Sequence, residues 1–374
     1  MAAASDVIVI GGGVIGLSLA WQLSRKGARV TLLERGEVGK ESSRSAAGML
    51  LPFGEAPARD PMFRLCLESL KLFPSFVREL EALTGLKVDL VASGALYPAW
   101  DASERAHFEK RFRWQGEFGL THQALDRHQI RARYPGLSRD LKTAYLVGND
   151  QQVDNRKLLA ALLAACQAGS VSVEEGQEAR EVRVRKGRTT GVKTARGTFK
   201  APWVVNAAGA WASRIAYPGL GEQPEVVPIR GQRITLGPTE TSRHYHPATT
   251  IFTHGCYLVP RADGSLILGA TEEEDGFSKQ VRPEGILLLL SKALRLFPAL
   301  NYYSVRSLEC GLRPAARDRR PLLGATSLKG YAMATGHYRN GILLAPITAR
   351  CLSDLVLDGT TSPHLREFSP ARSN

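Results

Sequence analysis

Cysteine is scarce in this sequence of 374 residues, and the few cysteines lie far apart. The five are Cys66, Cys166, Cys256, Cys310 and Cys351, and no two of them form a Cys-x-x-Cys pair. An odd number at wide spacing argues against a disulfide framework and a cysteine zinc site, and it favours a reducing cytoplasm. His244 and His246 form a His-x-His pair, but no third ligand accompanies them, so we expect no metal site.

Long apolar runs, repeats and low-complexity tracts are also missing. The N-terminal apolar stretch is too short for a signal peptide, and residues 286–290 are too few to span a membrane. Basic residues exceed acidic ones by 49 − 36 = 13, yet they are scattered, and no basic run is interleaved with aromatic residues. This pattern favours an anionic cofactor and substrate over nucleic acid, and it leaves homo-oligomerisation open.

The clearest pattern in the sequence lies at its N-terminal end. Residues 6–10 form an apolar, β-branched run that predicts a buried strand, and a glycine-rich turn and a helical pattern follow it. Residues 28–33 predict a second strand, which ends on Glu34. This order of strand, turn, helix, strand and acid is typical of a dinucleotide-binding unit.

The glycines of the turn have the spacing G-x-G-x-x-G. Gly11 permits the tight turn, Gly13 lets the backbone approach a pyrophosphate, and Gly16 lets helix and strand pack closely. Amides at the start of the helix attract phosphates, and Glu34 follows Gly16 by 18 residues, where an acid accepts hydrogen bonds from a ribose. These residues alone leave the choice between FAD and NAD open.

The rest of the chain changes from alternating strands and helices to consecutive strands. Buried strands are predicted at 202–211 and 331–335, whereas 226–236, 251–260 and 265–271 are successive strands typical of an antiparallel sheet. Helices are predicted at 60–83, 102–116, 126–133, 155–168, 283–297 and 342–357, and a hairpin at 182–194. The chain length favours two domains. We predict an α/β fold with a discontinuous Rossmann-like cofactor domain (1–86, 151–215 and 311–374) and an antiparallel-sheet substrate domain (87–150 and 216–310).

Five segments resemble the D-amino-acid oxidase family of flavoproteins. They are residues 9–16, 45–50, 256–261, 311–314 and 336–346, and they occur in the family's order over nearly the whole chain. Gly-His-Tyr-Arg-Asn-Gly at 336–341 is close to diagnostic of the glycine oxidases, the bacterial thiazole-pathway branch of that family. The resemblance implies the D-amino-acid oxidase fold and FAD as cofactor. Cys310 lies near the position where sarcosine oxidases attach flavin covalently, but we expect it to be a small buried residue and the FAD to be non-covalent.

The resemblance also implies where FAD would make contact. Residues 37–49 are small and polar and follow Glu34 directly, which by itself favours contact with a large ligand. The full predicted set is Gly11, Gly13, Val14, Ile15, Gly16, Glu34, Arg35, Ser42, Ser43, Ala47, Gly48, Met49, Arg180 (through its backbone, near adenine), Gly209, His337, Tyr338, Arg339, Asn340, Gly341, Ile342 and Leu343.

An oxidase of this kind must bind the substrate carboxylate and present Cα to flavin N5. Arg313 is the first candidate, because a guanidinium makes a bidentate, charge-assisted pair with a carboxylate. Tyr257 can donate to the same carboxylate. The resemblance places Arg339 at the substrate, although it could equally fix the flavin loop, and Met49 lines either the pocket or the core. No acid–base pair is required if hydride leaves Cα of a neutral amine directly.

The resemblance implies oxidation of glycine, sarcosine or a small D-amino acid. Dioxygen would be reduced to hydrogen peroxide, and the imine would yield a keto acid and ammonia or an amine. Two alternatives are an oxidase of N-carboxymethyl amines and a tRNA-modifying flavoprotein that acts on a glycine-like group. A third, an NAD dehydrogenase, is disfavoured by the flavin-type segment at 336–341.

Overall fold

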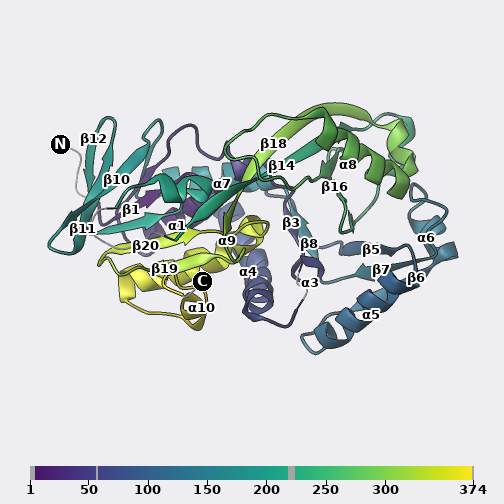
Figure 1. Ribbon diagram of the computed structural model, residues 1–374, viewed down its shortest axis with the longest axis horizontal. Helices are drawn as coiled ribbons and strands as arrows, with labels where there is room; N and C mark the ends of the chain where they lie inside the picture. Colours follow the sequence, from purple (N-terminus) through teal and green to yellow (C-terminus); the bar gives the residue numbers. More distant parts are fainter. Residues whose placement is uncertain (1–4, 56–57, 218–223, 373–374) are drawn as a thin grey trace.

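The structure, a computed structural model, describes residues 5–55, 58–217 and 224–372 (Figure 1). Two large sheets form the two ends of an elongated molecule, and helices pack on both. The predicted domain ranges also include residues 1–4, 56–57, 218–223 and 373–374, which lie outside the described ones. The domain boundaries stay a prediction. Strand β18 (Ser304–Ala316) is continuous across the predicted boundary at 311.

The first sheet has six strands in the order β19-β20-β13-β1-β2-β9. Their bounds are Leu322–Ala325, Tyr331–Thr335, Trp203–Asn206, Val7–Ile10, Val30–Leu33 and Val171–Glu174. All neighbours are parallel except β19, which runs antiparallel to β20. Strands β1 and β2 are buried on both faces, which explains their uninterrupted apolar sequences.

Helices cover one face of this sheet and a small sheet covers the other. The helices are α1 (Val14–Arg25), α4 (Pro61–Thr84), α7 (Asn155–Ala168) and α9 (Gly341–Asp358). The small sheet consists of β10 (Ala179–Arg185), β11 (Arg188–Thr194) and β12 (Gly197–Lys200). Three layers therefore bury the parallel strands and leave their carboxyl ends for a ligand.

The second sheet has eight strands in the order β18-β14-β17-β16-β15-β5-β7-β6. Besides β18, their bounds are Val226–Gly237, Leu266–Gly269, Tyr257–Pro260, Thr250–Phe252, Ala95–Ala99, Thr143–Val147 and His122–Asp126. It is antiparallel except where β15 meets β5. One face packs against α8 (Pro283–Leu296) and α6 (Arg127–Arg133), and the other against α5 (Ala102–Gly116).

Short elements complete the fold. A sheet of β3 (Met49–Leu50), β8 (Gln151–Val153) and β4 (Leu90–Val91) lies between the two large sheets in Figure 1. The remaining helical turns are α2 (Ser42–Ser45), α3 (Pro52–Glu55), α10 (Pro363–Glu367) and the 3₁₀ turns Gly209–Arg214, Thr241–Tyr245 and Pro298–Tyr302. Within the described ranges, no helix combines the length and apolarity needed to cross a bilayer.

Most predicted elements are present, and the differences have local causes. The single strand predicted at 251–260 is wrong: a turn at Thr253–Cys256 divides it into β15 and β16, with Thr253 N donating to Cys256 O at 2.9 Å. The strand predicted at 202–211 ends at Asn206, because Gly209 begins a 3₁₀ turn. Strands β6, β7, β8, β12 and β19 had no clear alternating pattern and were not predicted.

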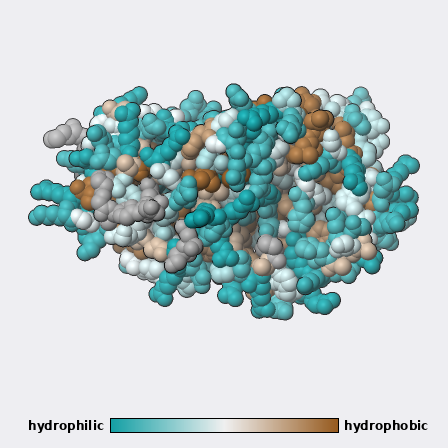
Figure 2. Space-filling model, viewed as in Figure 1, coloured by the Kyte–Doolittle hydropathy of each residue, from teal (hydrophilic) through white to brown (hydrophobic). Residues whose placement is uncertain are grey.

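Figure 2 shows a largely hydrophilic face with one apolar area at the upper right, where α8 and β18 lie. The exposed apolar side chains of these two elements are Leu287, Leu288, Val305 and Leu308. The cavity described below lies elsewhere, between the two large sheets.

The close packing of α1 on β1 gives a first prediction. A Cβ at Gly16 would lie less than 3.0 Å from the carbonyl oxygen of Gly11, which is backbone and has no other position. Gly16→Ala should therefore lower the free energy of unfolding by roughly 1–3 kcal/mol, as overpacking does. Thermal or urea unfolding measures this change.

Gly116→Ala is the matched control, because a Cβ at Gly116, the last residue of α5, would meet no atom within 4 Å. If Gly16→Ala is as stable as the control, α1 can move away from β1 without loss and the packing argument is wrong.

Candidate active site

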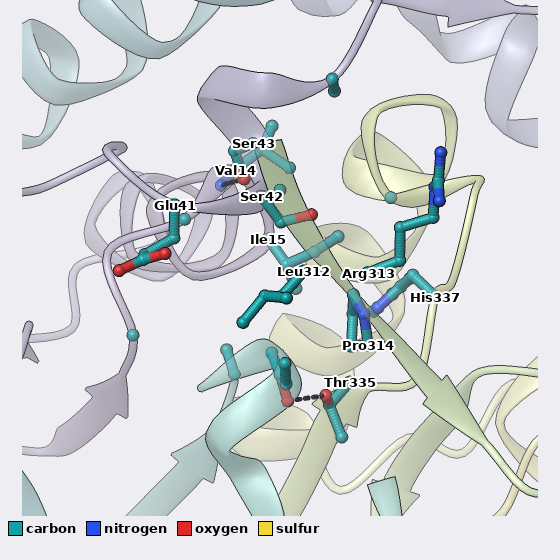
Figure 3. Close-up of a pocket in the computed structure, with 18 of the residues that line it drawn as sticks. Val14, Ile15, Glu41, Ser42, Ser43, Leu312, Arg313, Pro314, Thr335 and His337 are labelled. Carbon is teal, nitrogen blue, oxygen red and sulfur yellow. Dashed lines mark hydrogen bonds between the residues drawn. The ribbon is translucent and has the colours of Figure 1, made fainter. Parts of the chain in front are cut away.

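A cavity of about 430 Å³ lies where the carboxyl ends of the parallel strands meet β14, β16 and β18. Figure 3 shows Glu41 and Arg313 on opposite sides of it, with Val14, Ile15 and Leu312 between them. The Glu41 side also includes Glu34, Arg35, Arg180 and Trp211. The Arg313 side includes Met49, Glu55, Tyr257 and Arg339. The cavity thus joins the glycine-rich turn to the predicted substrate residues.

Nearly all residues predicted to contact the cofactor line this cavity. They are Gly11, Gly13, Val14, Ile15, Glu34, Arg35, Ser42, Ser43, Ala47, Gly48, Met49, Arg180, Gly209, His337, Tyr338, Arg339, Asn340, Gly341 and Ile342. Gly16 and Leu343 are not among the residues that line it, and their contact with the cofactor stays a prediction. Gly16 is buried against Gly11, and the Leu343 side chain, 1% exposed, packs into the core because its position on α9 faces the other helices.

The glycine-rich turn fits a pyrophosphate. Gly11 has φ +105°, and a Cβ there would lie less than 3.0 Å from the carbonyl oxygen of Ala207. Gly13 is the N-cap of α1 and supplies no side-chain cap. The amide of Val14 donates to the hydroxyl of Ser43 at 3.0 Å (Figure 3). The start of α1 therefore presents amides and a hydroxyl to the cavity, which is the donor set that a phosphate accepts.

Glu34 follows β2 and is 7% exposed. One carboxylate oxygen accepts from the amide of Gly12 at 2.7 Å, and the other from the amide of Gly36 at 2.9 Å. Its carboxylate is therefore fixed in the cavity wall, with lone pairs left for a ribose hydroxyl. Glu34 also fixes the glycine-rich turn, a role that its spacing alone did not indicate.

Arg233, which is buried, and Arg261, which is half-buried, fix the loop 42–49 along the cavity. Arg233 donates to the carbonyl oxygens of Arg44 and Ala46 at 3.3 and 3.2 Å, and Arg261 donates to that of Ala47 at 2.8 Å. Arg261 lies in a family segment, but nothing in the sequence indicated Arg233, because its partners are distant along the chain.

Arg233 also forms an ion pair with Glu309, which pairs with Arg156 as well. Burial by itself would raise the pKa of Glu309, but hydrogen bonds from Arg233 and Arg156 lower it to about 2. Glu309 is therefore ionised at neutral pH and compensates the charge of the buried Arg233.

The segment 337–341 leads into α9 along the cavity wall. His337 is 2% exposed and its Nε2 lies 3.1 Å from the Thr348 hydroxyl. Burial lowers the pKa of His337 to about 3, so the imidazole is neutral at pH 7. Asn340 gives α9 no side-chain cap, and Gly341 and Ile342 line the cavity. The positive end of the helix dipole is therefore directed at a ligand.

Arg313, on β18, is half-buried and donates to the carbonyl oxygen of Thr271 at 2.9 Å. Among the described residues, no carboxylate forms an ion pair with Arg313. Gly231 of the adjacent strand makes room for it, since a Cβ there would lie less than 3.0 Å from the guanidinium. Tyr257, on β16, is 7% exposed and lines the same cavity. A cation without an acidic partner next to a tyrosine suits a carboxylate ligand.

Arg339 differs from Arg313 in its partner. Its Nε and Nη2 donate to the two carboxylate oxygens of Glu55, each at 2.9 Å. Of the two roles considered for Arg339, loop fixation has the observed contact, although the residue also lines the cavity. Glu55 was not predicted as a site residue. Met49 lines the cavity and packs against the neighbouring core, so both of its expected environments occur together.

Cys310 lies one residue before Gly311 but is not among the cavity-lining residues of the described chain. Burial raises the pKa of its thiol. Cys310 is half-buried and lies in the middle of β18, whereas a small buried residue was predicted.

The comparisons with known proteins agree with this geometry. The family DAO, described as FAD dependent oxidoreductase, matches residues 6–355. Glycine oxidase from Geobacillus kaustophilus is 32% identical, covering 98% of this chain and 97% of that protein. Its crystal structure superposes with a TM-score of 0.93 and covers 99% of both chains. An iminodiacetate oxidase from Chelativorans sp. BNC1 superposes with a TM-score of 0.87 at 26% identity, covering 97% of this chain and 98% of that one.

A longer relative is the bifunctional protein ThiO/ThiG of Synechocystis sp., which is 40% identical over 375 residues. The match covers 100% of this chain and 54% of that protein. This chain thus spans about half the length of the curated relatives that it matches at highest identity.

Glu34 provides a test of the cofactor half of the cavity. Glu34→Ala removes a fixed acceptor for ribose hydroxyls and also frees the amides of Gly12 and Gly36. One charge-assisted hydrogen bond contributes roughly 1.5–3 kcal/mol, so the Kd for FAD should rise at least about tenfold. Fluorescence titration of the apoprotein with FAD measures it.

Glu37→Ala is the control, because Glu37 lies in the same loop with its side chain 72% exposed. An FAD affinity that is the same for Glu34→Ala and for the control would show that the ribose binds elsewhere.

Proposed function

This chain belongs to the DAO family of FAD dependent oxidoreductases, and from that membership we propose that it oxidises glycine or a closely related small amino acid. The family, the α/β fold and FAD as cofactor, all predicted from the sequence, are thereby confirmed. The proposed electron acceptor is dioxygen. The observation that carries the proposal is the guanidinium of Arg313, which has no acidic partner and faces the same cavity as the glycine-rich turn.

The substrate end of the cavity supports binding of an amino acid through its carboxylate. Arg313 can form a bidentate pair with that carboxylate, and the Tyr257 hydroxyl can donate to it. Both residues lie on strands of the eight-stranded sheet, so their positions are set before the substrate arrives. Binding at two points orients Cα, and orientation is the main contribution that a protein makes when the cofactor provides the chemistry.

FAD, when bound, supplies the acceptor for the hydride from Cα and the route of electrons to dioxygen. The chain's own residues bind and orient. The amides at the start of α9 and the neutral His337 line the cavity, and the helix dipole adds positive potential there. Met49 and Tyr257 line the cavity and pack in the same apolar cluster.

A second candidate is the oxidation of an N-carboxymethyl amine. The structural similarity to an iminodiacetate oxidase favours considering it. Both candidates use the same carboxylate anchor and differ in what surrounds the amine.

The first test concerns cofactor and substrate class. The purified protein should be yellow, release FAD into the supernatant on acid precipitation, and generate peroxide with glycine, sarcosine or D-alanine. An absorption spectrum and a peroxide assay over these compounds and over N-carboxymethyl amines measure it. Yellow colour in the acid pellet would contradict the non-covalent attachment, and a flavin-loaded protein that is inactive on the whole panel would contradict the proposed function.

The second test concerns Arg313. Arg313→Met keeps much of the volume and removes the charge, so a bound carboxylate loses its main partner. Removing one partner of such a pair costs on the order of 3–5 kcal/mol, or roughly 10²–10⁴ in kcat/KM. Because the pair also orients Cα, kcat should fall together with affinity.

Arg313→Lys should recover little activity, since an ammonium cannot reproduce the planar fork. Steady-state peroxide release and flavin occupancy are measured for both variants. Near-normal kcat/KM in Arg313→Met would mean that another residue, with Arg339 as the next candidate, binds the carboxylate. Loss of flavin or folding would mean that Arg313 is structural.

A further inference from the structure

The charged side chains Arg313, Arg339 and Glu55 differ in how they are paired. Arg313 contributes one cation without an acidic partner, whereas the charge of Arg339 is compensated by Glu55. All three side chains line the same cavity. We propose that Glu55 determines specificity, by restricting the site to amino acids that carry one carboxylate. This inference rests on the proposed oxidase function.

Glu55 and Arg339 form a bidentate ion pair. Both carboxylate oxygens accept from the guanidinium at 2.9 Å, and the side chains are only 15% and 26% exposed. The charge of Glu55 raises the pKa of Arg339, so the guanidinium stays a cation. The third nitrogen of Arg339 lies 3.8 Å from Glu272, a second acid that competes for the same cation. Arg339 therefore has no free charge to offer a ligand.

Hydrogen bonds from α5 to the backbone of α3 also fix the position of Glu55. It ends α3, whose carbonyl oxygens at Phe53 and Gly54 accept from Gln115 at 2.9 Å and from Arg111 at 3.2 Å. Both donors are buried residues of α5. The helical turn that ends at Glu55 is thus hydrogen-bonded to α5.

This charge arrangement treats one and two carboxylates differently. A monocarboxylate such as glycine neutralises Arg313 and leaves the Glu55–Arg339 pair intact. A dicarboxylate such as iminodiacetate brings a second negative charge to a region where Arg339 is already paired with Glu55 and where Glu272, a further acid, lies 3.8 Å from the same guanidinium. Like charges a few ångströms apart in a partly buried site repel strongly. The second carboxylate is therefore repelled by Glu55 and also finds no free cation, and both effects weaken the binding of a dicarboxylate.

The test compares two secondary amines of similar size, iminodiacetate with two carboxylates and N-ethylglycine with one. The measured quantity is the ratio of their kcat/KM values. Glu55→Gln removes the negative charge and frees Arg339, so the ratio of iminodiacetate to N-ethylglycine should rise by roughly ten- to a hundredfold over the wild type.

Two further variants identify the cause of that rise. Glu117→Gln is the control, because Glu117 is also a carboxylate paired with an arginine, Arg59, but its side chain is 57% exposed. This variant should leave the ratio unchanged. The double variant Glu55→Gln/Arg339→Gln removes both charges of the pair, which restores the wild-type net charge without freeing a cation, so the ratio should fall back toward the wild-type value. An unchanged ratio in folded, flavin-loaded Glu55→Gln overturns the proposal, as does an equal rise in the Glu117→Gln control.

A binding measurement on the wild type does not depend on the variants or on turnover. Diglycolate and methoxyacetate are unreactive ligands with two carboxylates and one, and each can be titrated against the flavin absorbance of the holoenzyme. The wild type should bind methoxyacetate at least several-fold more tightly, and equal or tighter binding of diglycolate overturns the proposal. A wild type that oxidises no amine but shows this preference would refute the proposed function while supporting the charge assignment.

Discussion

The ion pair between Arg233 and Glu309 joins the parts from which the cavity is built. Both residues lie on the long β14–β18 ribbon, where they are paired in register, and Arg233 reaches from there to the carbonyls of the loop 44–46. The same ribbon carries Arg313 and Gly231 to the substrate end. If Glu309 were lost, the charge of the buried Arg233 would remain uncompensated, at a cost of roughly 3–5 kcal/mol. The position of the loop 42–49 beside the cavity therefore depends on this pairing as well as on Arg261.

The parts of the site that could be predicted are those encoded by neighbouring residues. The strand, turn, helix and acid from Val7 to Glu34 follow one another in the sequence, so their spacing alone indicates a dinucleotide. The helices at 102–116 and 155–168 begin where predicted, because Asp101 and Asp154 cap their N-termini by accepting hydrogen bonds from first-turn amides. The family and FAD, in contrast, were predicted correctly from the resemblance that the five segments carry.

The parts that could not be predicted depend on contacts between distant residues. Glu55 meets Arg339 across 284 positions, and Arg233 meets Ala46 across 187. No periodicity or spacing can indicate such a pair, so Glu55 was not anticipated and Arg339 was left with two roles. The error at 251–260 is of another kind, because Gly255 marked a turn within an apolar stretch that was interpreted as one strand.

The single uncompensated cation at Arg313 has a consequence for the medium in which the protein works. A guanidinium bonded to one backbone carbonyl and facing a cavity attracts any small anion that fits, whether or not it carries an amine. If Arg313 binds the substrate carboxylate as proposed, acetate, formate or chloride in a buffer would compete with the amino acid for it. The apparent affinity for the amino acid would then depend on the small anions in the solution as well as on the site.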